Sequence, residues 1–137
     1  MKELVDRGYL DAERKYFRSG DYEYQELVET FADKILIWQE EKDYSGSTWA
    51  LLKRGDQYGY IPISWGSCSG CDALRGCNSY QEIVDLRDQL QNETSWGTLQ
   101  EVKEHVERRD AANSHYHQNK EFISFLEKLR GFDVGNV

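Results

Sequence analysis

The chain has 137 residues, of which 39% are hydrophobic and 13% aromatic, and it carries a net charge of −8 at pH 7. The length predicts a single domain over residues 1–137 with its own core, and the aromatic content argues against disorder. No apolar run reaches the length of a membrane-spanning helix and no basic stripe is present, which disfavours membrane insertion and direct nucleic-acid binding.

An N-terminal helix is the first predicted element. Asp21 can cap it, and Tyr24, Leu27, Val28 and Phe31 then follow with the spacing of one helical face.

Three strands are predicted next, over residues 34–41, 48–53 and 58–64. Short turns separate them, and the second turn contains Gly55, for which we expect a positive φ. Together they predict a three-stranded antiparallel meander. Pro62 has no N–H group to donate, so the third strand should be an edge strand or should end there.

The last part of the chain predicts helices. Ser79 to Glu82 and Thr98 to Glu101 have the pattern of capping boxes, and a final helix should end at Gly131. The predicted fold class is therefore α+β: an N-terminal helix, the three-stranded meander, and then about three helices packed on one face.

The three cysteines, Cys68, Cys71 and Cys77, lie within ten residues of one another. Two of them have the C-x2-C spacing of zinc knuckles, and Cys77 could add a third thiolate. His115 and His117 are candidates for the remaining ligand. Zinc is the one candidate cofactor that the sequence offers.

Three other interpretations of the cysteine segment stay open. C-x2-C is also the spacing of dithiol redox pairs, and a helix start after Cys71 would stabilise its thiolate. The Gly- and Ser-rich residues 66–70 could present backbone amides to an anion. Finally, cysteine is a small hydrophobic residue, and the segment could simply pack against the core.

Residues 58–74, and above all the run Trp65-Gly66-Ser67-Cys68-Ser69-Gly70-Cys71-Asp72, resemble a family of small bacterial and phage-borne proteins that carry this turn after a β-meander. The resemblance extends from about Ile35 to Val106. No activity is established for that family, so no catalytic residues carry over. The resemblance implies a phage or bacterial accessory protein that binds and modulates a host protein.

Acidic residues are in excess over residues 1–43 and 79–137, whereas residues 44–78 have a net charge of +1. Such a surface is either merely solvated or suited to a basic partner protein. We therefore expect a small, acidic, non-enzymatic protein-interaction module. The candidate interaction residues are Tyr58, Tyr60, Trp65 and Asp72.

No catalytic residue is assigned. The alternative function is a metal-dependent or thiol-based enzyme, or a redox protein, that uses the cysteine segment. Residues 1–5 lack the apolar core of a signal peptide, so a cytoplasmic location is expected.

Overall fold

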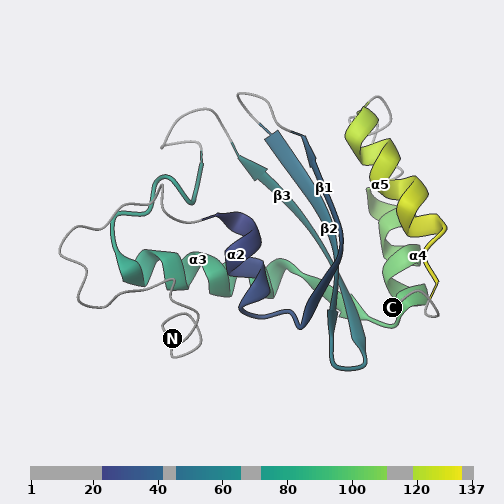
Figure 1. Cartoon of the computed structure of the whole chain (residues 1–137), viewed down its shortest axis with the longest axis horizontal. Helices are drawn as coiled ribbons and strands as arrows, with labels where there is room; N and C mark the ends of the chain where they lie inside the picture. Colours follow the sequence, from purple (N-terminus) through teal and green to yellow (C-terminus); the bar gives the residue numbers. More distant parts are fainter. Residues whose placement is uncertain (1–22, 42–45, 66–71, 111–118, 134–137) are drawn as a thin grey trace.

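The computed structural model describes residues 23–41, 46–65, 72–110 and 119–133, and its elements form one sheet with helices on both sides (Figure 1). The strands, in spatial as well as chain order, are β1 (Lys34–Glu41), β2 (Gly46–Arg54), β3 (Gln57–Trp65) and β4 (Ser95–Gly97), and all neighbours are antiparallel. The helices are α2 (Tyr24–Glu29), α3 (Tyr80–Glu93), α4 (Leu99–Arg109) and α5 (Lys120–Arg130). The predicted α+β class is confirmed.

The predicted meander is present as β1, β2 and β3, with β2 and β3 longer than expected by one or two residues at each end. A two-residue turn joins β2 to β3, with Arg54 opposite Gln57. Gly55 in this turn has φ +58°, as expected. Its backbone N–H donates a hydrogen bond to the carboxylate of Asp33 at 2.7 Å, which ties the turn to the residue before β1.

The fourth strand was not predicted, because three residues are too short to show a periodic pattern. β4 pairs with residues Tyr58 to Tyr60 of β3 and places Trp96 opposite Gly59. A Cβ at Gly59 would lie 2.7 Å from the Trp96 ring, so this close packing requires glycine. β3 is an inner strand of the sheet and continues past Pro62 to Trp65, so the prediction of an edge strand or a strand end is wrong. Pro62 is tolerated because β4 ends short of it, and that part of β3 has no other partner on this side among the described residues.

The prediction that about three helices pack on one face is wrong. α2 and α3 cover one face of the sheet, and α4 and α5 cover the other (Figure 1). The reason lies in β2, where Ala50 and Leu52 point into the first layer while Trp49 and Leu51 point into the second. A strand that is apolar on both faces needs cover on both faces.

The helix starts follow the predicted chemistry in part. Thr98 forms a complete capping box with Glu101 at the start of α4, and the Ser79 side chain accepts a hydrogen bond at the start of α3. α2 begins after Glu23, whose side chain makes no capping hydrogen bond, and Asp21 lies outside the described residues.

None of the helices in the described ranges is long and apolar enough to cross a membrane.

Candidate functional site: a polar cleft between β4 and α4

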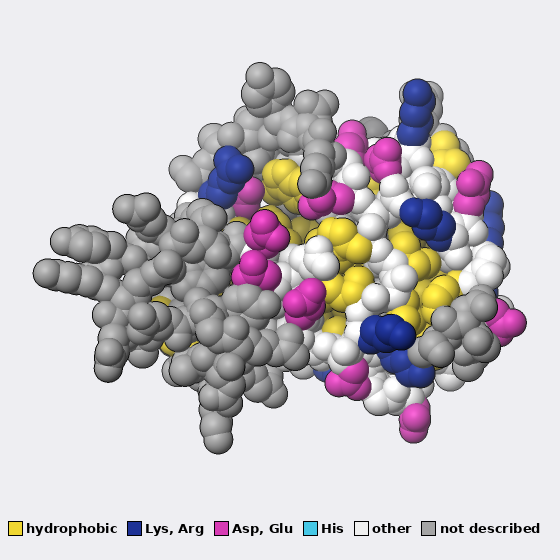
Figure 2. Space-filling model, viewed as in Figure 1, with side chains coloured by type: hydrophobic (Ala, Val, Ile, Leu, Met, Phe, Trp, Pro, Cys, Tyr) yellow, Lys and Arg dark blue, Asp and Glu magenta, His cyan; other side chains and the backbone are white. Residues whose placement is uncertain are grey.

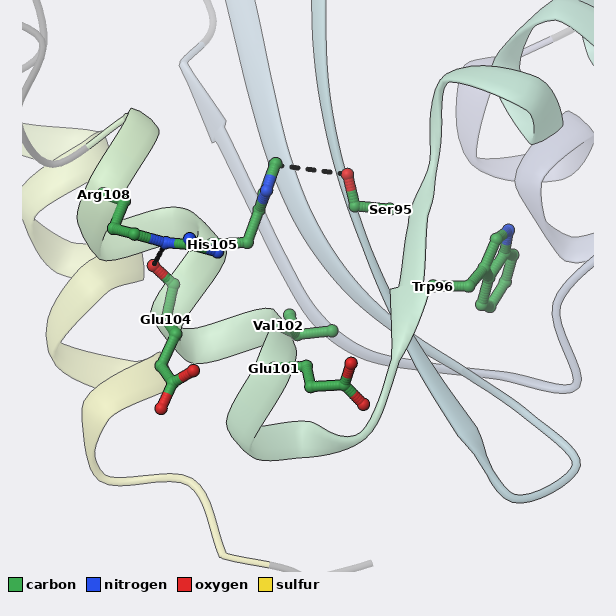
Figure 3. A pocket seen from close by; sticks show the side chains of 7 residues that line it. All are labelled: Ser95, Trp96, Glu101, Val102, Glu104, His105 and Arg108. Atoms are coloured by element: carbon green, nitrogen blue, oxygen red, sulfur yellow. Dashed lines mark hydrogen bonds between the residues drawn. The ribbon is translucent and has the colours of Figure 1, made fainter.

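Two adjoining hollows lie where β4 meets α4, with volumes of about 280 Å³ and 310 Å³. Ser95 and His105 line both hollows, so this pair lies at the junction between them. Figure 3 shows the first hollow, with His105 and Ser95 pointing toward one another. The second extends past β3 to the C-terminal end of α4 and is lined also by Tyr60, Pro62, Glu93, Arg109 and Asp110.

The position of His105 follows from the buried face of α4. Val102 and Val106 of this helix are buried against the sheet, and His105 lies beside them at the margin of that face. The side chain therefore reaches across to β4 instead of into solvent. Ser95 faces it because side chains alternate along the strand: Trp96 projects to the opposite side of β4, toward the α2–α3 layer (Figure 3).

The Ser95 hydroxyl and Nε2 of His105 are 3.2 Å apart, within hydrogen-bond distance. Either atom can donate, depending on the imidazole tautomer. When Nε2 carries no proton, the Ser95 hydroxyl donates to it. This is the arrangement in which an imidazole can remove the proton of a serine that acts as a nucleophile.

A buried pair of polar side chains forms the wall of the second hollow. The Tyr60 hydroxyl donates a hydrogen bond to the carboxylate of Asp110, and the two residues are 1% and 6% exposed. The Tyr60 ring also lies 6.3 Å from the His105 ring, centroid to centroid. Asp110 is thus a buried carboxylate held at the C-terminal end of α4, and like His105 it lines the second hollow.

Charged side chains of both signs line the rest of the cleft. Arg108 and Arg109 supply positive charge, and Glu93, Glu101 and Glu104 supply negative charge. Mixed charges of this kind can stabilise groups of either sign that develop during a reaction.

Of the segment that carries the three cysteines, the structure describes the part from Asp72 to Cys77, which forms a packed turn. Asp72 is buried and accepts hydrogen bonds from the Tyr24 hydroxyl at 2.6 Å and from the backbone N–H of Leu74 at 3.0 Å. The Tyr24 ring stacks on Trp65 at 5.9 Å between centroids. Burial and the hydrogen bond to Asp72 raise the pKa of Tyr24 well above its ordinary value. Through these two contacts, Tyr24 joins α2 to Asp72 in the turn and to Trp65 at the end of β3.

Cys77 is buried in the α2–α3 layer, and its thiol donates a hydrogen bond to the carbonyl of Ala73 at 3.2 Å. Burial raises the pKa of this thiol, and the nearby carboxylates, Glu82 first among them, raise it further. A higher pKa leaves less thiolate at neutral pH, and thiolate is the form that ligates zinc or attacks an electrophile.

Most of the candidate metal ligands lie outside the described residues: Cys68, Cys71, His115 and His117. Within the described ranges, no group of three or more His, Cys, Asp or Glu side chains is placed to hold a metal ion. The zinc and thiol interpretations therefore stay predictions.

Two of the candidate interaction residues belong to the core. Tyr58 and Tyr60 are 5% and 1% exposed and pack in the α4–α5 layer, which leaves little of either side chain to meet a partner. Trp65 is only partly buried.

Neither Ser95 nor His105 was among the candidate site residues that the sequence indicated. No local signal was available, because the two residues meet only when the three-residue strand β4 pairs with β3.

Comparison of the chain with family models, with curated proteins and with solved structures finds no match.

Proposed function

We propose that the protein is an interaction module that binds a basic surface of another protein through its α2–α3 side. This binding requires no catalytic step. The observation that carries the proposal is the uneven distribution of charge between the two helical layers.

The α2–α3 side carries nearly all of the excess negative charge. Residues 23–33 contain four acids and no base, and α3 contains four acids and one base, for a net charge of −7. The helices α4 and α5 together have a net charge of +1. In Figure 2, most of the dark blue Lys and Arg side chains lie on the side of the molecule where Figure 1 places α4 and α5.

Within the part of the chain that the structure describes, neutral side chains hold three of these eight carboxylates. Amide side chains one helical turn away donate to Glu29, Asp85 and Glu93. The only base of the two segments, Arg87, is mostly buried and donates to Thr30 of the neighbouring segment and to Asp88. A surface field in which one sign predominates attracts a partner of the opposite sign and accelerates its approach.

The acids of α2 also repel one another. Burial raises the pKa of Glu26, and the charges of Glu23 and Glu29 raise it further. A basic partner would relieve this repulsion when it binds, which adds to the affinity. The resemblance to bacterial and phage-borne proteins makes a host protein of a bacterium the partner to look for.

Two variants of equal net charge test the proposal. Glu26→Gln with Asp85→Asn removes two charges from the α2–α3 side, and Glu104→Gln with Glu127→Gln removes two from the other side. Each protein is immobilised, exposed to a bacterial lysate, and its bound proteins are identified. We expect a basic protein that the wild type and the second variant retain and that the first variant loses.

The association rate of the purified partner is then measured at several salt concentrations. It should fall as salt rises, because at physiological ionic strength exposed charges are screened beyond about 8 Å. Equal retention by both variants, together with an association rate that does not depend on salt, would contradict the proposal.

A further inference from the structure

We propose that Ser95 and His105 form a nucleophile–base pair that cleaves small carboxylic esters in the cleft between β4 and α4. The proposal goes beyond the binding function. It rests on the 3.2 Å hydrogen bond between the two side chains and on the two hollows that meet at this bond.

The size of the cleft sets the class of substrate. Each hollow, at about 280 Å³ or 310 Å³, is near the lower end of the volumes of ligand pockets, about 300 Å³. An ester whose acyl group occupies one hollow and whose alcohol occupies the other would place its carbonyl carbon at the junction, beside Ser95. Short acyl groups and small alcohols fit this arrangement.

The reaction balances with the groups that line the cleft. Nε2 of His105 takes the hydroxyl proton as Oγ of Ser95 forms a bond to the carbonyl carbon. The bond to the alcohol oxygen then breaks, and the imidazolium returns its proton to the departing alcohol. Water, deprotonated by the same imidazole, attacks the acyl carbon, and Ser95 regains its proton as the carboxylic acid leaves.

Two other residues of the second hollow fit supporting roles. The carboxylate of Asp110, held by Tyr60, supplies negative charge in the hollow that His105 also lines, where an imidazolium forms during the reaction. Arg109 supplies positive charge in the same hollow, where negative charge develops on the carbonyl oxygen.

The test is covalent labelling of the purified full chain with a fluorophosphonate. This probe loses fluoride as a serine nucleophile forms a bond to its phosphorus atom, and mass spectrometry identifies the labelled residue. We expect the label on Ser95, its complete loss in Ser95→Ala, and a decrease in labelling rate of about a hundredfold in His105→Gln. The same variants should lose hydrolysis of p-nitrophenyl acetate.

Ser64→Ala is the matched control, since Ser64 is an exposed serine whose hydroxyl lies 3.3 Å from that of Ser47. It should keep the wild-type labelling rate. Circular dichroism and melting temperature establish that each variant is folded. Absence of label on Ser95 in folded wild-type protein, or a rate that His105→Gln leaves unchanged, would overturn the proposal. Because none of these substitutions lies in α2 or α3, this result is independent of the binding experiment.

Discussion

At the residue scale, Gly55 shows how one backbone angle secures the meander. Its φ of +58° is in the left-handed region that side chains disfavour. Apart from Gly55 and its two chain neighbours, no atom of the described residues lies within 4 Å of the position that a Cβ would take. Any cost of a side chain here therefore comes from the backbone and not from a clash.

We expect Gly55→Val to lower the free energy of unfolding by about 1–3 kcal/mol, because a β-branched residue resists a positive φ. Chemical denaturation measures the loss. Gly55→Asn is the control and should lose less, since asparagine adopts this conformation more readily. A stability of Gly55→Val equal to that of the wild type would contradict the importance of this turn.

Cys77 gives a second prediction at this scale, concerning its reactivity. In a variant with Cys68→Ser and Cys71→Ser, Cys77 is the only remaining thiol. Burial raises its pKa, and each unit of increase lowers the thiolate fraction about tenfold. We expect the native protein to react with a disulfide reagent more slowly than free cysteine, and at the rate of free cysteine in denaturant. Rapid reaction of the native form would instead favour an accessible, reactive thiol.

At the scale of elements, one ion pair joins the two helices that cover the second face of the sheet. Arg130 of α5 donates to Glu107 of α4 through two hydrogen bonds, of 2.6 Å and 3.0 Å. The hydrogen bonds to Arg130 lower the pKa of Glu107. The stabilisation is therefore present above the ordinary carboxyl value of 4.5 and is lost as the pH falls through the lowered pKa of the folded state.

A double-mutant cycle with Glu107→Gln and Arg130→Gln measures this coupling. Both side chains are about half exposed, so solvent screens the pair and we expect a coupling of about 0.2–1 kcal/mol at pH 7 and low salt. The coupling should decrease in 1 M salt and at acidic pH. A coupling that persists under both conditions would show that packing, and not charge, links the two helices.

At the scale of the whole molecule, the sheet separates an acidic layer from a nearly neutral one. Burial raises the pKa of Glu26 on the first side, and the neighbouring charges of Glu23 and Glu29 raise it further. A carboxyl whose pKa is raised by folding binds protons more readily in the folded state. The contribution of Glu26 to stability is therefore complete below pH 4.5, the pKa of this carboxyl in the unfolded state. It is lost as the pH rises through the higher pKa of the folded state.

We accordingly expect Glu26→Gln to raise the free energy of unfolding at pH 7, by about 0.2–0.5 kcal/mol for the relief of like charges on a helix. This gain should disappear below about pH 4.5. Denaturation at a series of pH values measures it. Glu127→Gln on α5, which changes the net charge equally, is the control and should show no such gain. A gain of the same size in both variants would attribute the effect to net charge alone.

Much of the fold could be predicted because its signals are local. The short apolar runs of β1 to β3, the glycine of the β2–β3 turn and the capping box of α4 each depend on residues a few positions apart. Strand β4 could not be predicted, since its three residues are held by pairing with β3 and by the packing of Trp96 on Gly59. The candidate cleft was missed for the same reason.

By itself, the sequence determined the α+β class, the three long strands, the starts of α3 and α4, and the acidic character of the chain. Only the tertiary structure decided which helices share a face, and thereby collected a net charge of −7 on the α2–α3 side. It also decided that His105 meets Ser95. Short-range hydrogen bonds and side-chain periodicity act within one element, whereas the choice of face depends on how distant apolar surfaces are buried together.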